Sequence, residues 1–327
     1  MLSLGIIASS FQVAAGLSSF ATGGTIPGTI NSLAYVNGTA VLDQAGTGSR
    51  YSDALFASTT LGGATIDTPN LSWGANGVVL KTGRNGSGTV TIARTSDGGQ
   101  TWATALNVTR AGDRIETVTY ADVSGTARWI APVHGDNDVY LSTDNGASFA
   151  EQSNVLGGTA RDWIASTRMG SAFAVFNSNV TAYYTSEIGT TWTLRTLPTT
   201  PSSNDGRAFA SSNDVTMYMS AGSVVYTTND LVSWTLQGTV GVGAITWDAP
   251  TSLTYGNGNW VLALGDGGSN QIGIWYSSNN GSSWSTATVQ GSASASEIRD
   301  AAFNSADNGF YVIGRGGGIN RVYRGLS

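Results

Sequence analysis

Short runs of β-branched and aromatic residues recur along the chain, separated by segments rich in glycine, serine and asparagine. Ala172–Asn177 reads AFAVFN, Val180–Tyr184 reads VTAYY and Gln271–Tyr276 reads QIGIWY. Such residues are enriched in strands, and short runs of them bounded by turn residues predict β-strands. The chain is therefore predicted to be all-β, with almost no α-helix.

One eight-residue motif follows a predicted strand again and again. Its pattern is Ser/Thr-x-Asp-x-Gly-x-Ser/Thr-Trp, and its third positions are 42 to 50 residues apart. The five copies are Thr95–Trp102, Ser142–Phe149, Thr185–Trp192, Thr227–Trp234 and Ser277–Trp284. This spacing accommodates four short antiparallel strands, which is the repeat length of a β-propeller blade.

The motif has a local physical explanation. The third-position acceptor can bind backbone N–H groups downstream, the glycine supplies a positive φ, and the final aromatic ring packs on the hairpin. The fourth copy is degenerate, because Leu231 replaces the glycine. We expect structural roles for Asp97, Gly99, Trp102, Asp144, Gly146, Phe149, Glu187, Gly189, Trp192, Asn229, Trp234, Asn279, Gly281 and Trp284.

Partial repeats flank the five copies and bear on the number of blades. Upstream strands are predicted at Ile30–Val36, Thr39–Asp43, Arg50–Phe56 and near Gly63–Ile66, and downstream strands at Glu297–Phe303, Phe310–Arg315 and Asn320–Gly325. The last set is one strand short, and residues near Ser18–Pro27 could complete it and remove an open sheet edge. We predict a seven-bladed ring over residues 28–327, with residues 1–27 as a ring-closing strand or docking arm. A six-bladed ring is the alternative.

On its five motif copies, the sequence resembles the Asp-box (BNR-repeat) propellers of the sialidase-like superfamily. The resemblance implies motif hairpins at the blade periphery, away from the usual active site. Enzymes of this kind use three arginines, a tyrosine nucleophile assisted by glutamate, and an aspartic acid/base. The expected Arg-Ile-Pro signature is missing, and the chain has only four glutamates. We therefore assign no catalytic residue.

Composition excludes several kinds of site. The chain has no cysteine, one histidine and a net charge of −6, with Lys81 as its single lysine. Thiolate and multi-histidine metal sites are excluded, and phosphate backbones need clustered cations that are absent here. We expect no cofactor, no metal and no nucleic-acid partner.

The first charged residue of the chain is Asp43. Leu2–Phe20 is moderately apolar, but serine, glutamine and glycine interrupt it, and no positive region precedes it. It is therefore a poor membrane span and a poor secretory signal. The opening LSLGIIASS resembles the start of many phage virion and tail-fibre proteins, which implies docking to another virion protein. A loosely packed terminus is the alternative.

Arginine stands beside aspartate where one predicted repeat crosses to the next. The crossings read Asp113–Arg114, Arg161–Asp162–Trp163, Asp205–Gly206–Arg207, Thr246–Trp247–Asp248 and Arg299–Asp300. Because innermost strands converge on the axis, Arg114, Arg161, Arg207 and Arg299, with Trp163 and Trp247, are candidate ligand-binding residues. Arg–Asp pairs that clamp neighbouring blades are the alternative.

These observations predict a non-enzymatic virion structural or glycan-binding propeller of a phage tail, fibre or capsid, located in the particle. Two alternatives remain: a sialidase-like hydrolase of acidic sugars, and a bacterial secreted or assembly-factor propeller. The expected partners are other virion proteins, reached through the N-terminal segment, and a cell-surface glycan. A homo-oligomer is compatible with this prediction, and membrane insertion is not expected.

Overall fold

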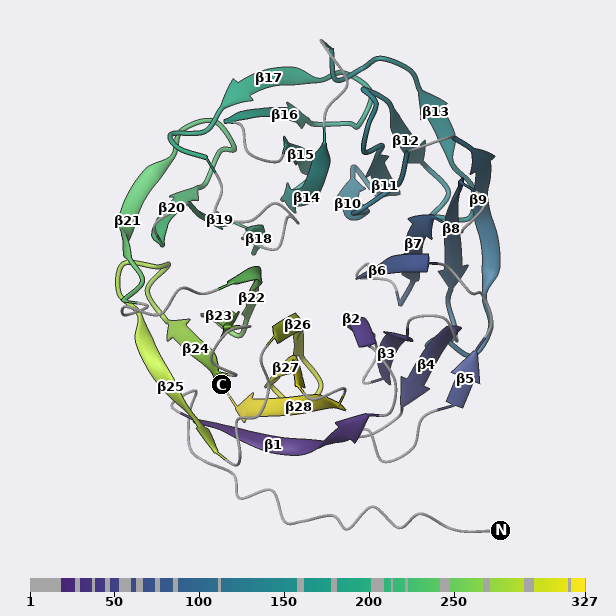
Figure 1. Cartoon of the computed structure of the whole chain (residues 1–327). Coiled ribbons are helices and arrows are strands. Elements are labelled where there is room, and N and C mark those ends of the chain that lie inside the picture. Colours follow the sequence, from purple (N-terminus) through teal and green to yellow (C-terminus); the bar gives the residue numbers. More distant parts are fainter. Residues whose placement is uncertain are drawn as a thin grey trace, which may run out of the picture.

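A computed structural model gives the structure of the chain. It describes residues 19–26, 30–36, 39–44, 48–52, 60–62, 67–73, 77–84, 88–110, 113–157, 162–177, 181–200, 209–212, 214–220, 223–241, 248–266, 271–290, 297–316 and 319–326. Regular structure in these residues is entirely β, as the sequence predicts, and the strands stand in a ring around a central axis (Figure 1).

Five sheets have four antiparallel strands each. The first sheet contains β2 (Ile30–Val36), β3 (Thr39–Gln44), β4 (Gly48–Ser52) and β5 (Thr60–Gly62). The second contains β6 (Asp67–Trp73), β7 (Val79–Arg84), β8 (Thr89–Thr95) and β9 (Ala103–Thr109). The third sheet contains β10 (Thr119–Val123), β11 (Thr126–Pro132), β12 (Val139–Ser142) and β13 (Ala150–Gln152). The fourth contains β14 (Trp163–Met169), β15 (Ala172–Asn177), β16 (Ala182–Ser186) and β17 (Thr193–Thr196). The fifth contains β18 (Phe209–Ser211), β19 (Thr216–Met219), β20 (Val224–Thr228) and β21 (Thr235–Thr239). Together with the eight-stranded sheet described next, these sheets form a β-propeller.

The remaining sheet has eight strands and includes the N-terminal strand of the described chain. Its order is β22 (Asp248–Gly256), β23 (Asn259–Asp266), β24 (Gln271–Ser277), β25 (Ser285–Gln290), β1 (Ser19–Ile26), β28 (Ile319–Leu326), β27 (Gly309–Gly316) and β26 (Glu297–Asn304). β1 is antiparallel to β28 and parallel to β25, with Ser19 opposite Thr288. Divided at the parallel contact, the eight strands form two groups of four. A segment from before the repeats thus supplies the fourth strand beside β28, whereas residues 1–18 lie outside the described residues.

Two strands begin earlier in the chain than the sequence pattern predicts. β4 is Gly48–Ser52 instead of Arg50–Phe56, and β5 is Thr60–Gly62 instead of Gly63–Ile66. This part of the chain is rich in small residues and lacks the clear apolar alternation that defines strand ends elsewhere.

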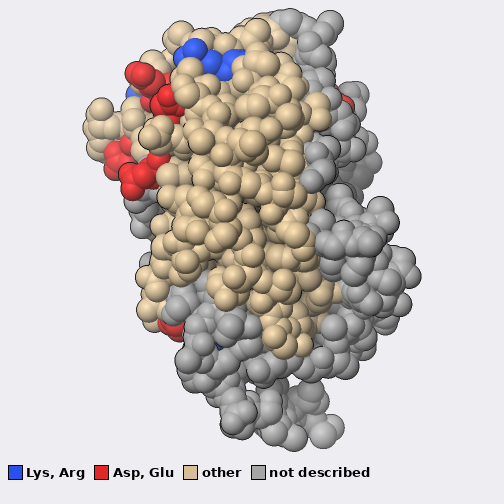
Figure 2. All heavy atoms as spheres, turned by 90° about the vertical axis from the view of Figure 1, so that its left-hand side faces the viewer, with Lys and Arg blue, Asp and Glu red and all other residues tan. Residues whose placement is uncertain are grey.

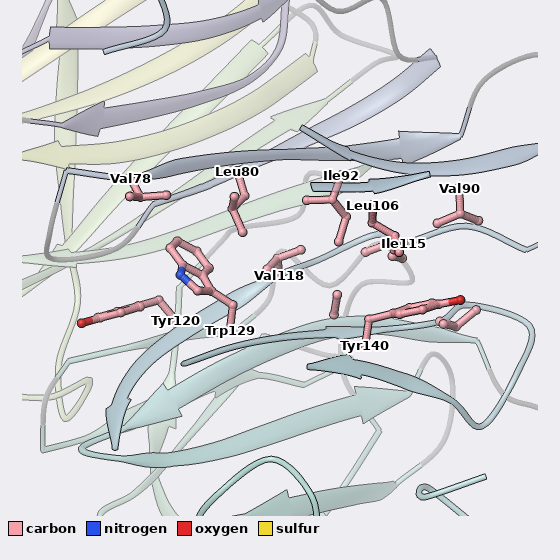
Figure 3. Close-up of a cluster of buried hydrophobic side chains, with 12 residues drawn as sticks. Val78, Leu80, Val90, Ile92, Leu106, Ile115, Val118, Tyr120, Trp129 and Tyr140 are labelled. Atoms are coloured by element: carbon pink, nitrogen blue, oxygen red, sulfur yellow. The ribbon is translucent and has the colours of Figure 1, made fainter. Parts of the chain in front are cut away.

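The hydrophobic core lies between neighbouring sheets. In Figure 3, Trp129 and Tyr140 from the β10–β13 sheet face Leu80 and Ile92 from the β6–β9 sheet, and all four side chains are buried. Burying such side chains contributes about 1.5–3 kcal/mol each, so every sheet depends on the next for its stability.

The motif turns carry the hydrogen bonds that the sequence predicts. In the first copy, the Thr95 hydroxyl donates to Asp97 at 2.7 Å, and Asp97 accepts the backbone N–H of Thr101 at 3.0 Å. Ser142 with Asp144, and Ser277 with Asn279, repeat this pattern. The prediction of a structural turn is confirmed for these three copies.

The third and fourth copies depart from the ungapped alignment. β16 ends at Ser186 and β20 at Thr228, one residue later in the motif than in the other copies. The Thr228 hydroxyl donates to Asp230 at 2.8 Å, so the fourth acceptor is Asp230 and not Asn229. Glu187 is exposed and caps no turn in the described structure. Because hydroxyl residues stand at both motif positions, the sequence alone conceals this one-residue shift.

Each motif turn packs on the preceding sheet. A Cβ added to Gly146 would lie 3.1 Å from Cδ2 of Leu80, and the Asn145 carbonyl accepts the Arg94 Nε–H at 3.0 Å. In the fourth copy, Leu231 takes the glycine's place with a φ of 55° and is 1% exposed. The turns therefore fasten one sheet to the next as well as closing a hairpin.

Candidate functional site

A cavity of about 400 Å³ lies at the centre of the ring. It is lined from β2, β10, β14, β18, β22 and β26, whose positions around the axis are visible in Figure 1. The hydroxyl-bearing residues in its wall are Thr117, Thr119, Ser166, Thr167, Ser211, Thr254, Tyr120 and Tyr255. The side chains of Phe209 and Phe303 add apolar surface.

Hydroxyl groups connect the strands around this cavity. Ser166 on β14 lies 2.9 Å from the Thr117 oxygen and 2.6 Å from the Thr119 oxygen on the β10 side. Thr167 is hydrogen-bonded in turn to Ser211 of β18. Hydroxyls both donate and accept, so this wall can bind uncharged polar groups of either kind.

The cavity wall contains one acidic and one basic residue in the described structure. Asp300 accepts the backbone N–H of Leu33 at 2.8 Å and that of Ala301 at 2.8 Å, which ties β26 to β2. Arg168 lies 5.8 Å from the centre of the Tyr120 ring and donates to the Gly170 carbonyl at 3.3 Å. The carboxylate thus has a structural role.

The predicted arginine ring is not assembled within the described residues. Arg114 forms a backbone bridge with His134, and its side chain binds Glu116 and approaches the His134 Nε2 atom at 2.9 Å. Arg299 belongs to β26, and neither arginine lines the cavity. Arg161, Arg207 and Trp247 lie outside the described residues, so the ring stays a prediction.

Trp163 has a packing role instead of the expected ligand-binding one. Its side chain is 1% exposed, and its indole N–H donates to the Asp136 carbonyl at 2.8 Å. The aromatic character that suggested a binding residue reflects its place in the core between two sheets.

Arg110 organises an acidic cluster that sequence reasoning missed. It contacts Asp138 at 2.5 Å, Glu151 at 2.9 Å and Asp136 at 3.0 Å, and its Nε donates to the Tyr140 hydroxyl at 3.1 Å. These partners come from β12, β13 and the preceding turn, so only the folded chain brings them together. Arg110 also lies 3.6 Å from Asp113, the aspartate that adjacency in the sequence pairs with Arg114.

The electrostatics of this cluster are those of a structural clamp. Burial alone lowers the pKa of Arg110, but hydrogen bonds to Asp138 and Glu151 outweigh it and raise the pKa. Hydrogen bonds from Ser153 and Arg110 lower the pKa of Glu151 to about 2. Glu151 therefore remains ionised at neutral pH and does not act as a proton donor there.

Among the described residues, no three His, Asp or Glu side chains are arranged to hold a metal ion. The described part of the chain also contains no helix long and apolar enough to cross a membrane.

Solved structures resemble this chain closely in shape. YCF48 bound to a D1 peptide is 14% identical, with a TM-score of 0.65 over 97% of this chain and 99% of that one. A virginiamycin B lyase from Staphylococcus aureus with quinupristin is 15% identical, with a TM-score of 0.68 over 93% and 99%. The WD40 propeller domain of Doa1 is 10% identical, with a TM-score of 0.59 over 94% and 97%. The chain has a β-propeller fold.

At these identities the likeness extends to the fold alone. No protein-family model and no curated protein matches the sequence. None of the three structures is described as an Asp-box or phage tail protein. The Asp-box resemblance and the virion role therefore stay predictions.

Proposed function

We propose that this chain is a non-enzymatic virion propeller that binds an uncharged cell-surface glycan in its central cavity. The observation that carries the proposal is the cavity wall, where hydroxyl groups from neighbouring inner strands surround a space of about 400 Å³. Sugar hydroxyls donate and accept hydrogen bonds, and the wall hydroxyls can do the same. Tyr255 and Phe303 add the apolar surface on which a sugar ring can pack,.

This proposal differs from recognition of an acidic sugar. Glu116 already neutralises Arg114, and Arg168 is engaged with Tyr120 and Gly170. In the described wall, the carboxylate of Asp300 accepts two backbone N–H groups. A hydrolase would need an acid and a nucleophile beside the substrate, so these contacts favour binding over sialidase-like catalysis.

The proposed place of the chain is a phage tail, fibre or capsid. The support is the resemblance of LSLGIIASS to the start of phage virion proteins and the lack of charge before Asp43. We propose that the N-terminal segment contacts another virion protein. The bacterial assembly-factor alternative gains support from one structural neighbour, YCF48, whose structure contains a D1 peptide.

A glycan array probed with the full chain tests the proposal. We expect binding to neutral oligosaccharides, which titration calorimetry with the best-bound oligosaccharide would confirm. Ser166→Ala and Tyr255→Ala should each weaken binding by about tenfold, because each removes a contact worth about 1–1.5 kcal/mol. Arg114→Gln is the control and should leave binding unchanged.

Two outcomes would contradict the proposal. Binding restricted to anionic glycans and lost in Arg114→Gln would favour the arginine ring. Absence of glycan binding, with capture of a peptide on a peptide array, would favour an assembly factor.

A further inference from the structure

An apolar patch occupies the rim of two neighbouring sheets. Among the described residues, the exposed large hydrophobic side chains are Ile188, Leu194, Val232 and Leu236, with 42%, 58%, 46% and 59% exposed. Ile188 and Val232 belong to the third and fourth motif turns, and Leu194 and Leu236 to the outer strands β17 and β21. These four residues are called the apolar patch. Concentration of all four on two of the sheets indicates a surface that something covers.

The fold does not require leucine in the outer strands. Leu194 and Leu236 stand two residues after the motif aromatic. In the other three copies, this position is occupied by Thr104, Glu151 and Thr286, all polar and exposed. The outer strand therefore forms equally well with a polar residue here.

Ile188 replaces a residue that stabilises the turn elsewhere. Ile188 lies two residues after Ser186, the hydroxyl residue at the end of β16. Asp97 and Asp144 occupy the equivalent position in the first two copies. Those aspartates cap the turn with hydrogen bonds, which isoleucine cannot make. An exposed aliphatic side chain at a capping position lowers local stability, so its presence points to a contact.

A groove runs into the apolar patch. A cavity of about 360 Å³ is lined by Ile188, Leu231 and Val232 from the two motif turns. Its wall also contains the charged residues Glu187, Arg195 and Asp230 and the hydroxyl residues Thr185, Ser186, Thr191 and Thr193. Figure 2 faces the flank of the ring that carries β21, and most of its described surface has no charged atoms; these gather toward the upper and left borders. The four exposed side chains of the apolar patch favour an apolar occupant,.

The chain itself contains a segment of that character. Residues 2–18 read LSLGIIASSFQVAAGLS and carry no charge. β1 begins at Ser19, opposite Thr288 of β25, and the sheet containing β25 touches the β21 sheet through a 2.9 Å hydrogen bond from Ser282 to Gln237. Seventeen extended residues span about 55–60 Å, which is enough to pass along the rim of two sheets.

We propose that residues 2–18 bind the apolar patch of their own chain. Tethering beside the neighbouring sheet gives the segment a millimolar effective concentration, which favours this occupant over a free partner. The segment shields the patch in the isolated protein. Incorporation into a particle would exchange this contact for one with a neighbouring protein, so the same segment can serve both states.

Photo-crosslinking of the full chain tests the proposal. The chain would carry p-benzoylphenylalanine in place of Phe11, and equal amounts of ¹⁴N- and ¹⁵N-labelled protein would be mixed before irradiation. Mass spectrometry should find crosslinks to peptides containing Ile188, Leu194, Val232 or Leu236. Both peptides of each crosslink should carry the same isotope, because the contact lies within one chain.

A matched pair of variants separates this contact from a general effect on folding. Leu194→Glu combined with Leu236→Glu should reduce the crosslink by at least about tenfold, because two buried leucine contacts are lost. Thr104→Glu combined with Thr286→Glu places the same charges at equivalent strand positions and should leave it unchanged. Crosslinks of mixed isotope, crosslinks elsewhere, or an undiminished crosslink in the leucine variant would each overturn the proposal.

Discussion

The indole N–H of Trp234 donates to the hydroxyl of Tyr183 at 2.9 Å, across the boundary between two neighbouring sheets. The same hydroxyl donates to the Leu231 carbonyl at 2.9 Å, and Tyr183 is fully buried. Burial raises the pKa of Tyr183, so it stays protonated at neutral pH. The motif copy that departs most in sequence is thus held on the preceding sheet by one tyrosine.

Tyr183→Phe should lower the free energy of unfolding by about 1–3 kcal/mol, since it leaves the partly buried indole N–H of Trp234 and the Leu231 carbonyl without their partner,. Urea denaturation followed by tryptophan fluorescence would measure the loss. Tyr226→Phe is the control, because that ring stacks on Tyr218 in the same aromatic cluster and its hydroxyl has no hydrogen bond in the described structure. Equal losses in the two variants would contradict the role of the Tyr183 hydroxyl.

Asp97→Ala should destabilise the chain by about 1–2 kcal/mol, because the backbone N–H of Thr101 loses its acceptor,. Asp97→Asn should cost much less, since Asn279 accepts the Ser283 N–H at 3.0 Å in the fifth copy. Thermal melting would rank the variants. Glu187→Ala is the control, because Glu187 caps no turn in the described structure. This variant should melt at the same temperature as the unaltered chain. A larger loss in Glu187→Ala than in Asp97→Ala would contradict the corrected motif alignment.

Stability should fall on acidification below about pH 4. Hydrogen bonds from Thr101 outweigh partial burial and lower the pKa of Asp97 to about 2, and the backbone N–H of Ser233 lowers that of Asp230 to about 2. A folded-state pKa below the unfolded value contributes stability above about pH 4, and this is lost as the pH falls through about 2. Melting curves from pH 6 to pH 2 would show the decline.

The matched variant for this prediction combines Asp97→Asn, Asp144→Asn and Asp230→Asn. Its stability should depend less steeply on pH in the same window, because the titrating groups are gone while the amide oxygens still accept. An unchanged slope would show that other acids control the acid transition.

Arg110→Met should destabilise the chain by about 3–5 kcal/mol, because it leaves the buried carboxylate of Asp138 beside two further acids without their cation,. Arg110→Lys should recover only part of the loss, since an ammonium group lacks the planar fork that reaches several acceptors. Arg114→Gln, at a more exposed pair, should cost less than about 1 kcal/mol,. Urea denaturation distinguishes a clamp from a surface pair; similar costs for Arg110→Met and Arg114→Gln would contradict the clamp.

Much of the architecture is readable from the sequence because its causes are local. β-branched runs favour strands, and the motif residues bond to backbone atoms within a few positions of themselves, as Asp97 does with Thr101. These interactions recur at nearly equal spacing, so the strand–turn unit and its repetition follow from the residues alone. The same locality explains the error in the fourth copy, where Thr227 and Thr228 are equivalent by residue type and only the folded hairpin selects Thr228.

The contacts between sheets were decided by the tertiary structure. Trp163 reads as a binding residue until the neighbouring sheet buries it, and Arg110 gathers Asp136, Asp138 and Glu151 from later segments of the chain. The central cavity likewise exists only once β2, β10, β14, β18, β22 and β26 meet around one axis. Sequence patterns report which face of a strand is apolar, but which residues meet across a ring depends on closure of the whole chain.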